Sequence, residues 1–480
     1  MAPVPSLPVL RLGQPYESLD VVEVTDAARG MTLARVGQAN SGLIRRDLRR
    51  LGAARRAIAS VGGQELCRRC GRAAELFMEA DLPLAGTMTQ SPAEYVASLS
   101  STSGLPHVMC RRNMDKVVSV LSRMDEILRG LTRGLDTTIL DRGWGAQDGA
   151  LIGYTATAEG LGVVLPSNSP GVNSIWLPAV ALGIPVVVKP GREEPWTPWR
   201  LIQALIAAGC PAEAFGFYPA SHDGAAAILE GCGRSILFGD DATTRPYAHD
   251  ATVQCHGTGR SKILVGPDRI DDWPDLLDLI VGSVADNGGR SCINASCIVV
   301  PRHADAIAEA LAERLGALGP KPADDPDAPL SAFANPNVAE AIDAAIDRAL
   351  EDPGARDVTA PHRAGPRRIV RHGLNYLLPT VVRCAQPDHP LANTEFLFPF
   401  VSVVEMDMVA AADWIGPTLA ATVISDDSDV VDRFVTNPRI DRINLGPVPT
   451  TKVAWDQPHE GNLFEFLYQR RAIQREESVA

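Results

Sequence analysis

Apolar segments rich in β-branched residues alternate with helical segments through the middle of the chain, and this alternation constrains the fold most strongly. GVVLP (162–166) and IPVVVKP (184–190) predict strands, and WTPWRLIQALIAAG (196–209) predicts a helix with a Thr197 cap and Pro198 at its first position. Such repetition indicates a parallel sheet with helices on its faces. In open sheets of this type, ligands bind beyond the carboxyl ends of the strands. No GxGxxG pattern follows the first strand, so a dinucleotide would bind without that fingerprint.

A second α/β segment and a hairpin complete the predicted α/β architecture. The second segment begins near Cys255 and includes the strand patterns KILVG, SCIVVPR and TVVRC, with an alanine-rich helix over Ala304–Leu318. Ahead of the first segment, TTILD and ALIGYTATA flank the polar turn WGAQDG and predict two strands of a hairpin over Thr137–Ala156. Helical spacing marks Ser41–Ala80 and Met114–Leu131. The last patterned segment, FEFLYQRRAI, fits a strand or a helix.

Composition excludes several classes of function. The 480 residues include 45 Lys and Arg against 58 Asp and Glu, a formal charge of −13, and aromatic residues make up 5%. A phosphate-backbone binder needs clustered cations and a base-stacking platform needs aromatic rings, so no nucleic-acid partner is expected. The nine cysteines are spread too thinly for a disulfide scaffold. The single CxxC of Cys67 and Cys70 lacks a second pair at zinc spacing, so no metal site is expected.

Neither a signal peptide nor a membrane span is predicted. The start MAPVPSLPVLRLG lacks a basic region followed by an apolar stretch. The longest apolar stretch, Ile175–Val188, is interrupted by Pro178, Gly183 and Pro185, and it falls short of the ~20 residues that a membrane helix needs. These features predict a cytoplasmic protein.

The segment Asn287–Cys292, NGGRSC, is the sharpest candidate for chemistry. Its glycines allow a tight turn that approaches a ligand closely, and Arg290 would favour the thiolate of Cys292 electrostatically. By itself the segment is also compatible with a buried, unreactive cysteine, which is how we interpret Cys297. Five further segments accompany it along the chain: PSNSP (166–170), VVVKPG (186–191), LFGDDATTR (237–245), CHGTGRSK (255–262) and TEFLFP (394–399).

In their order and separation, the six segments resemble the patterns PWNxP, VVVKPSE, FTGSxxxG, ELGGKS, NxGQxC and ExFGP of the aldehyde dehydrogenase superfamily over nearly the whole chain. The resemblance implies a Rossmann-like cofactor domain (1–136 and 157–254) and an α/β catalytic domain (255–445). It also implies bridging elements that serve in oligomerisation (137–156 and 446–480). The exposed edges of the hairpin need a partner, so a homodimer or homotetramer is expected.

The resemblance also implies a role for each matching residue. Cys292 matches the nucleophile that forms a thiohemiacetal and then a thioester with the aldehyde carbon, and Asn168 matches the amide that stabilises the oxyanion together with the Cys292 backbone N–H. Asn168 would equally suit an Asx turn or a helix cap. The other matches concern a nicotinamide cofactor that exchanges a hydride with the substrate carbon: Pro166 and Ser167 in the cofactor site, Lys189 at the adenosine ribose, Gly239 and Asp240 near the pyrophosphate, and Glu395 at the nicotinamide ribose.

One departure from the family bears on the product. The general base of the family is the glutamate of ELGGKS, and His256 stands at its place here. A thiol of pKa ~8.5 needs little help from a base, whereas water of pKa ~15.7 needs it. We therefore expect an acylating enzyme of the acyl-CoA reductase type, with coenzyme A as co-substrate. Two alternatives remain: a hydrolytic dehydrogenase with His256 as the base, and a cofactor-binding pseudoenzyme without turnover.

Other departures bear on the cofactor and the substrate. Arg192 stands where NAD-preferring members often have a glutamate, and an arginine pairs with a 2′-phosphate, so NADP(H) is favoured. An exposed Arg192 without that role would leave NAD(H) as the cofactor. Asp240 replaces a serine beside the pyrophosphate, where a carboxylate is unfavourable unless it turns away, and Leu397 and Phe398 alter ExFGP. The tail GPVPTTKVAWDQPHEG matches no family pattern, so it does not define the aldehyde or acyl-CoA substrate. His459 in this tail is expected to be an exposed loop residue, although it could reach a substrate.

Overall fold

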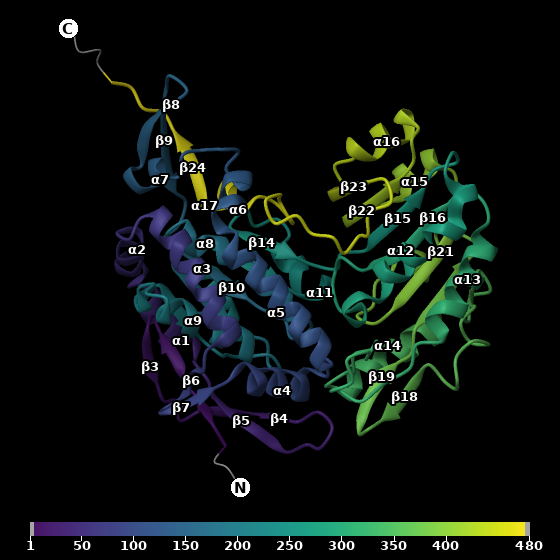
Figure 1. Cartoon of the computed structure of the whole chain (residues 1–480), viewed down its shortest axis with the longest axis horizontal. Helices are drawn as coiled ribbons and strands as arrows, with labels where there is room; N and C mark the ends of the chain where they lie inside the picture. Colours follow the sequence, from purple (N-terminus) through teal and green to yellow (C-terminus); the bar gives the residue numbers. More distant parts are fainter. Residues whose placement is uncertain (1–3, 476–480) are drawn as a thin grey trace.

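A seven-stranded sheet forms the framework of one lobe of the computed structural model, which describes residues 4–475 (Figure 1). Strand β2 pairs antiparallel with β12 and with β3, and the other neighbouring strands pair parallel. The spatial order is β14 (Val253–His256), β13 (Gly233–Phe238), β10 (Gly160–Val164), β11 (Val186–Lys189), β12 (Phe215–Phe217), β2 (Val9–Arg11) and β3 (Gln14–Tyr16).

A second seven-stranded sheet forms the other lobe (Figure 1). Its edge strand β17 pairs antiparallel with β20, and the remaining pairs are parallel. The parallel pairing and the intervening helices confirm the predicted α/β class. The spatial order is β17 (Ala355–Asp357), β20 (Thr380–Cys384), β21 (Phe400–Glu405), β16 (Ala295–Val300), β15 (Ser261–Val265), β22 (Thr418–Ile424) and β23 (Ile440–Leu445).

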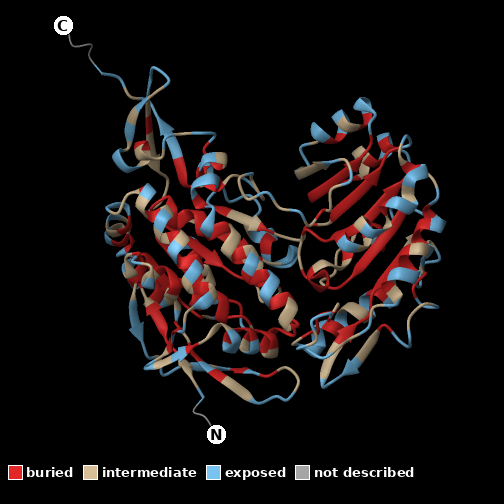
Figure 2. Ribbon diagram, in the orientation of Figure 1, coloured by how far each residue is buried: buried red, intermediate tan, exposed pale blue. Residues whose placement is uncertain are grey.

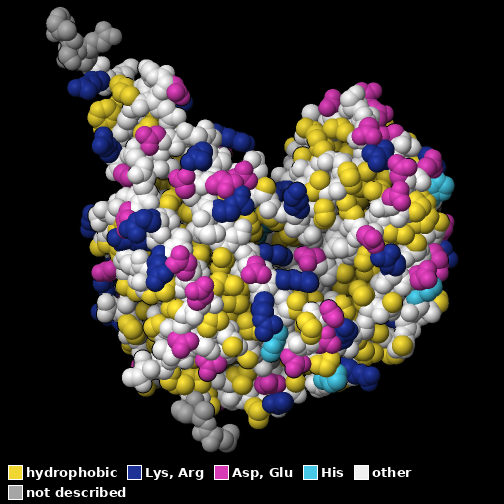
Figure 3. Space-filling model, viewed as in Figure 1, with side chains coloured by type: hydrophobic (Ala, Val, Ile, Leu, Met, Phe, Trp, Pro, Cys, Tyr) yellow, Lys and Arg dark blue, Asp and Glu magenta, His cyan; other side chains and the backbone are white. Residues whose placement is uncertain are grey.

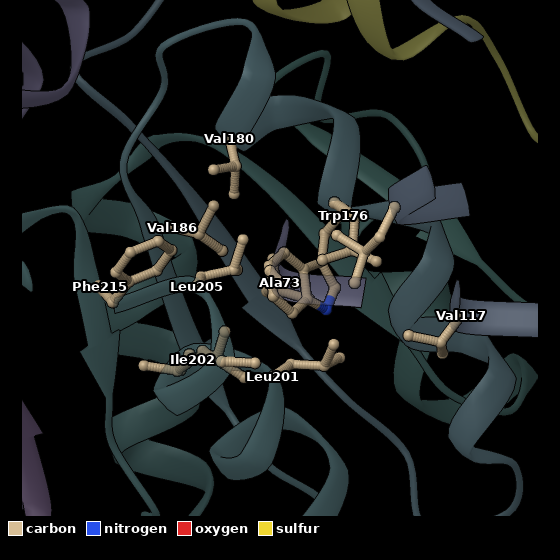
Figure 4. Packing of buried hydrophobic residues seen from close by; sticks show 14 of the residues in the cluster. Ala73, Val117, Trp176, Val180, Val186, Leu201, Ile202, Leu205 and Phe215 are labelled. Carbon is tan, nitrogen blue, oxygen red and sulfur yellow. The ribbon is translucent and has the colours of Figure 1, made fainter. Parts of the chain in front are cut away.

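Helices cover both faces of the first sheet because its central strands are apolar on both sides. Val186 and Val188 of β11 pack into the core on one face, while Val187 packs into the core on the other. Figure 4 shows the larger of these cores around Val186, Leu205 and Trp176. The first face is covered mainly by α3 (Gly63–Glu79), α5 (His107–Ser122) and α9 (Trp196–Ala207), and the second by α1 (Ser41–Leu48) and α10 (His222–Gly231).

The second sheet is built in the same way. Ile263 and Val265 of β15 pack on one face, and Leu264 packs on the other. The central strands of both sheets are therefore buried along most of their length (Figure 2). Helices α12 (Trp273–Ala285) and α13 (Ala304–Gly316) cover the first face of this second sheet. Its other face is covered by α14 (Pro336–Ala349), α15 (Met408–Trp414) and α16 (Ser428–Val435).

The bridging hairpin is shorter than the sequence predicts. It consists of β8 (Trp144–Gln147) and β9 (Ala150–Ala156), whereas the TTILD segment forms the helix α7 (Thr138–Arg142), so the strand prediction there is wrong. Asp136 Oδ1 accepts hydrogen bonds from the N–H and hydroxyl of Thr138 at 3.0 and 2.8 Å, and Gly143 with φ +79° follows the helix. These local contacts outweigh the strand preference of Thr and Ile.

The C-terminal segment FEFLYQRRAI divides between the two structures that its pattern allows. It forms the short helix α17 (Leu463–Leu467) and then the strand β24 (Tyr468–Arg471). Strand β24 pairs antiparallel with β9, so the hairpin becomes a three-stranded sheet that projects from the first lobe (Figure 1).

The start of α9 differs from the predicted cap. The helix begins at Trp196, and the side chain of Glu194 supplies the cap: its Oε1 accepts hydrogen bonds from the N–H of Thr197 at 2.8 Å and from its hydroxyl at 2.6 Å. Thr197 is therefore the donor and not the cap. Glu194 is fully enclosed, and this burial raises the pKa of its carboxyl to about 8.

The buried Glu194 predicts that stability falls as pH rises. In the unfolded chain this carboxyl loses its proton near pH ~4.3, whereas the folded protein keeps it up to about 8. Its contribution to stability is therefore complete below the unfolded pKa and is lost as pH rises through the folded pKa. Urea titrations should show that wild type loses stability relative to Glu194→Gln between pH 5 and pH 8, by at most ~1.4 kcal/mol per pH unit. A pH-independent difference would contradict this, and Glu193→Gln, at the half-buried neighbour, is the control.

The remaining elements pack around these layers. None of the helices between residues 4 and 475 combines the length and the apolar character needed to cross a bilayer. The elements are β1 (Ser6–Leu7), β4 (Val21–Thr25), β5 (Thr32–Gly37), α2 (Leu51–Ala59), β6 (Leu82–Ala85), β7 (Met88–Gln90), α4 (Pro92–Ser103), α6 (Met124–Leu131), α8 (Leu177–Ala181), α11 (Asp241–Thr244), β18 (Arg368–Arg371) and β19 (Leu374–Leu377).

Candidate active site

A cavity of about 540 Å³ receives residues from both lobes. Its lining includes the loop after β10, the ends of β13 and β14, and residues 290–293 before β16. The space-filling view shows the surface of the molecule hollowed between the lobes (Figure 3). The cavity thus lies beyond the carboxyl ends of parallel strands, where the alternation of strands and helices predicts a ligand.

The loop that carries Cys292 has an unusual backbone. Asn287, Gly288 and Gly289 all have positive φ, at 53°, 66° and 70°. A Cβ on Gly289 would lie 2.3 Å from the backbone carbon of Phe398, so glycine is needed there for space as well as for conformation. The glycines of NGGRSC therefore form the predicted tight turn, and the close approach that Gly289 allows is to the neighbouring loop at Phe398.

Cys292 is half-buried and lines the cavity. Its backbone carbonyl accepts a hydrogen bond from the Ser261 hydroxyl at 2.8 Å, and a Cβ on Gly259 would lie 2.0 Å from the same oxygen. Burial raises the pKa of the Cys292 thiol well above its usual range, and the carboxylates of Glu460 and Glu395 raise it further. The thiol is therefore held mostly protonated in the free protein.

Arg290 does not serve the thiolate as predicted. Its side chain is buried and directed elsewhere: Nε donates to the Ser331 hydroxyl at 3.0 Å, Nη2 donates to the Ala332 carbonyl, and the guanidinium lies 4.8 Å from the centre of the Phe333 ring. The guanidinium therefore ties the Cys292 loop to residues 331–333 and is not among the charges that shift the Cys292 pKa.

Asn168 lies against the Cys292 loop. Its Nδ2 donates a hydrogen bond to the backbone carbonyl of Arg290 at 2.9 Å, and its buried Oδ1 has no protein partner within the described residues. Asn168 also lines the cavity. The structure thus places the amide against the loop that carries the thiol. An oxyanion formed beside this loop would meet N–H donors.

His256 and two residues of the tail form a cluster at the same cavity. Nδ1 of His256 contacts Oε2 of Glu460, and the His459 ring stacks on the His256 ring with centroids 6.1 Å apart. His459 is half-buried and lines the cavity, so the expectation of an exposed histidine is wrong. Sequence reasoning missed Glu460, because no pattern in the tail marks it. Cys67 and Cys70 lie half-buried and buried on α3, far in sequence from this cluster.

Most of the residues that the sequence assigns to a cofactor line the cavity: Pro166, Ser167, Gly239, Asp240 and Glu395. Lys189 stands half-buried at the end of β11, where burial lowers the pKa of its ammonium. Arg192 is exposed and lines a separate cavity of about 240 Å³ instead. Gly191 brings the loop after β11 against the loop after β10, since a Cβ on it would lie 2.4 Å from the Pro166 carbonyl oxygen.

Asp240 and Glu395 are both occupied by protein donors. Asp240 Oδ1 accepts from the N–H and hydroxyl of Thr243 at 2.9 and 2.7 Å, so its charge is directed to the start of α11. This is the condition under which an aspartate is compatible with a nearby pyrophosphate. Glu395 Oε2 accepts from the Arg260 N–H at 2.6 Å, and burial raises the pKa of this carboxyl to about 8. These residues therefore fit a dinucleotide that crosses the ends of β10 and β13.

Solved structures with the same fold are numerous. The structure of indole-3-acetaldehyde dehydrogenase with NAD+ has a TM-score of 0.78 to this chain at 19% identity, covering 97% of this chain and 95% of that one. The aldehyde dehydrogenase KauB from Pseudomonas aeruginosa has the same TM-score and identity, covering 97% and 96%. Similarity at this level of identity shows a shared fold.

Sequence comparison also identifies relatives of this chain. The N-succinylglutamate 5-semialdehyde dehydrogenase 2 of Caulobacter vibrioides is 29% identical over 325 residues, 63% of this chain and 64% of that protein. The aminoacetaldehyde dehydrogenase of Pseudomonas aeruginosa is 29% identical over 272 residues, 52% and 51% of the two chains. The match thus spans less than two thirds of the length of either relative. The sequence model of the aldehyde dehydrogenase family, however, matches residues 16–462, from the first sheet through the Cys292 loop to the tail, and the chain therefore belongs to that family.

Proposed function

We propose that this protein oxidises an aldehyde with a nicotinamide cofactor through a thioester on Cys292. The observation that carries the proposal is one cavity holding the Cys292 thiol, the Asn168 amide and the residues at the ends of β10 and β13. The Cys292 sulfur would attack the aldehyde carbon, and the Asn168 amide and Cys292 N–H would donate hydrogen bonds to the resulting oxyanion. When bound, the cofactor supplies the oxidation by accepting the hydride.

The product that we propose is a carboxylic acid. His256 lines the cavity and its ring is buried, so a base is available to the water that must cleave the thioester. The names of the relatives, which are dehydrogenases of semialdehydes and of an aminoaldehyde, support oxidation of a small aldehyde. The acyl-CoA product that the missing glutamate predicts is the second candidate, since a thiol needs no such base.

The proposal extends to the choice between NADP(H) and NAD(H) and to the residues that would join subunits. NADP(H) would be preferred if Arg192 reaches the 2′-phosphate, and NAD(H) would serve if the exposed Arg192 does not. Residues 1–136 and 157–254 would hold the cofactor, 255–445 would hold the nucleophile, and 137–156 with 446–480 would join subunits of a dimer or tetramer. Trp144 and Leu151, exposed on the hairpin, are the side chains that such contact would cover.

A product assay tests the proposal. The enzyme is mixed with a panel of small aldehydes and with NAD+ or NADP+, with and without coenzyme A, in water enriched in ¹⁸O. We expect reduced cofactor in stoichiometric amount with acid that carries ¹⁸O, at a rate indifferent to coenzyme A. Turnover that requires coenzyme A and gives a thioester would replace the hydrolytic proposal with the acylating one. Absence of both turnover and an acyl adduct on Cys292 would indicate a pseudoenzyme.

A further inference from the structure

The imidazole of His256 is buried between two rings and a carboxylate. It stands at the end of β14 with 4% of the residue exposed. The Phe238 ring lies on it with centroids 4.7 Å apart, and the His459 ring stacks at an interplanar angle of 15°. Within the described residues neither ring nitrogen has a hydrogen bond of ordinary geometry, and the polar atom that reaches Nδ1 belongs to Glu460. The ring is thus oriented by packing; the carboxylate that contacts it is that of Glu460, and the carboxylate of Asp441 lies within electrostatic range of it.

Glu460 reaches His256 because the tail is anchored on both sides of it. Arg442 of β23 donates from Nη1 to the Pro458 carbonyl at 2.7 Å, and Asn462 Nδ2 donates to the Leu131 carbonyl at 2.8 Å. Gly461 has φ +88°, and a Cβ on it would lie 2.6 Å from Gln254 Nε2, so the turn is seated against β14. Only 13% of the Glu460 side chain is exposed. These contacts hold the carboxylate beside the imidazole.

We infer that Glu460 is the positioning residue of a carboxylate–imidazole pair that takes over the task of the glutamate missing at position 256. Glu460 would accept a hydrogen bond from Nδ1–H of His256 and so fix the tautomer in which Nε2 carries the lone pair. The inference rests on the proposed function, since it assigns the base for the hydrolytic step. It places the carboxylate in the C-terminal tail, on a different element from the loop between β14 and β15.

The step balances with water as the co-reactant. The oxygen of a water molecule bonds to the thioester carbon while its proton passes to Nε2 of His256. The carbon–sulfur bond then breaks, and its electron pair remains on the Cys292 sulfur. The acid leaves, and the proton on Nε2 returns to the sulfur or to solvent. Glu460 stabilises the transient imidazolium, as a buried carboxylate does when it faces a histidine base.

The position of Glu460 relative to Cys292 is consistent with this role. The Glu460 carboxylate is the leading charge that raises the pKa of the Cys292 thiol, so the tail lies within electrostatic range of the sulfur. His256 and Cys292 are linked by the loop between β14 and β15, which begins after His256: Gly259 of this loop packs against the Cys292 carbonyl, and Ser261, the first residue of β15, donates a hydrogen bond to it. Base and thioester therefore belong to one packed unit.

Glu460→Gln tests the inference by separating thioester formation from its hydrolysis. The amide keeps the size of the side chain and removes the charge that stabilises the imidazolium. With aldehyde and cofactor, acid-quenched samples should still show the acyl adduct on Cys292 by intact mass. Its decay should slow by about 10²-fold. Hydroxylamine, a nucleophile that needs little basic help, should clear the adduct and restore turnover. Glu465→Gln, at the exposed acid on α17, is the control and should behave as wild type.

Several outcomes would overturn the inference. Decay of the adduct within threefold of the wild-type rate would show that Glu460 does not assist His256. Loss of adduct formation in a variant that keeps the wild-type melting temperature would assign Glu460 to the thiol instead. Full restoration of turnover by zinc after chelator treatment of the wild type would make the cluster a metal site. If Glu460→Gln does not fold, Glu460→Asp, which withdraws the charge by one methylene, should slow decay while keeping the adduct. Failure of the proposed function is distinct, because wild type would then form neither adduct nor acid.

Discussion

Cys292→Ser should abolish aldehyde oxidation, with kcat/KM lower by at least about 10⁴-fold. The serine hydroxyl occupies nearly the same volume as the thiol but is a much weaker nucleophile, and the base role that we propose for His256 is to assist water and not to activate a hydroxyl. Cofactor binding should persist, because the lining residues at the ends of β10 and β13 are unchanged. Reduced-cofactor fluorescence measures turnover, and intact mass after quenching should show no acyl adduct.

Cys255→Ser is the matched control for this substitution. Cys255 is half-buried beside His256, and its Sγ lies 3.7 Å from the Thr244 carbonyl oxygen, a weak contact whose loss in serine is a small change. Its activity should stay within a few-fold of wild type. Equal loss in both variants would mean that the chemistry does not belong to Cys292, and the proposed function would then fail.

The second large effect is expected from Gly259→Ala. The added Cβ would lie 2.0 Å from the carbonyl oxygen of Cys292 and 2.7 Å from its carbonyl carbon, so the Cys292 backbone must shift. A displacement of about 1 Å at a reacting group costs about 10²-fold in rate. The overpacking should also lower the free energy of unfolding by about 1–3 kcal/mol. Turnover and urea denaturation on the same preparation measure the two effects separately.

Gly257→Ala, two residues earlier in the same loop, separates crowding from a general loss of glycine. The closest atom to its added Cβ is Thr244 Oγ1 at 3.6 Å, an ordinary contact. We expect much smaller losses of activity and stability. If both variants behave alike, then the close approach of the loop to Cys292 is not what positions the thiol.

Much of the fold follows from local pattern. Val186, Val187 and Val188 form a continuous apolar run because both faces of a central parallel strand are buried, and such a run is recognisable without coordinates. The TTILD segment shows where this reasoning stops. Its residues prefer strands, but the Asp136 side chain satisfies the first backbone donor and Gly143 ends the turn, so a helix forms.

In the candidate site, too, local backbone conformation could be predicted from the sequence, whereas contacts with distant segments could not. Asn287, Gly288 and Gly289 are consecutive, and their conformations are local, so the sequence reveals a tight turn before Cys292. The direction of a long side chain is not local. Arg290 is two residues from the thiol, but its guanidinium is engaged by the Phe333 ring and the Ser331 hydroxyl and is not among the charges that shift the Cys292 pKa. The prediction that Arg290 favours the Cys292 thiolate was therefore wrong, because it relied on proximity along the chain alone.

By itself the sequence determined the family and the α/β class, and it pointed to Cys292 and Asn168 as candidates for the nucleophile and the oxyanion-binding amide, because each of these depends on short patterns that follow one another along the chain. The tertiary structure alone decided that Glu460 meets His256. That contact joins the end of β14 to a tail held by Arg442 and Asn462. The contact between Glu460 and His256 depends on packing between segments that are distant in the sequence, and local periodicity does not indicate where such segments meet.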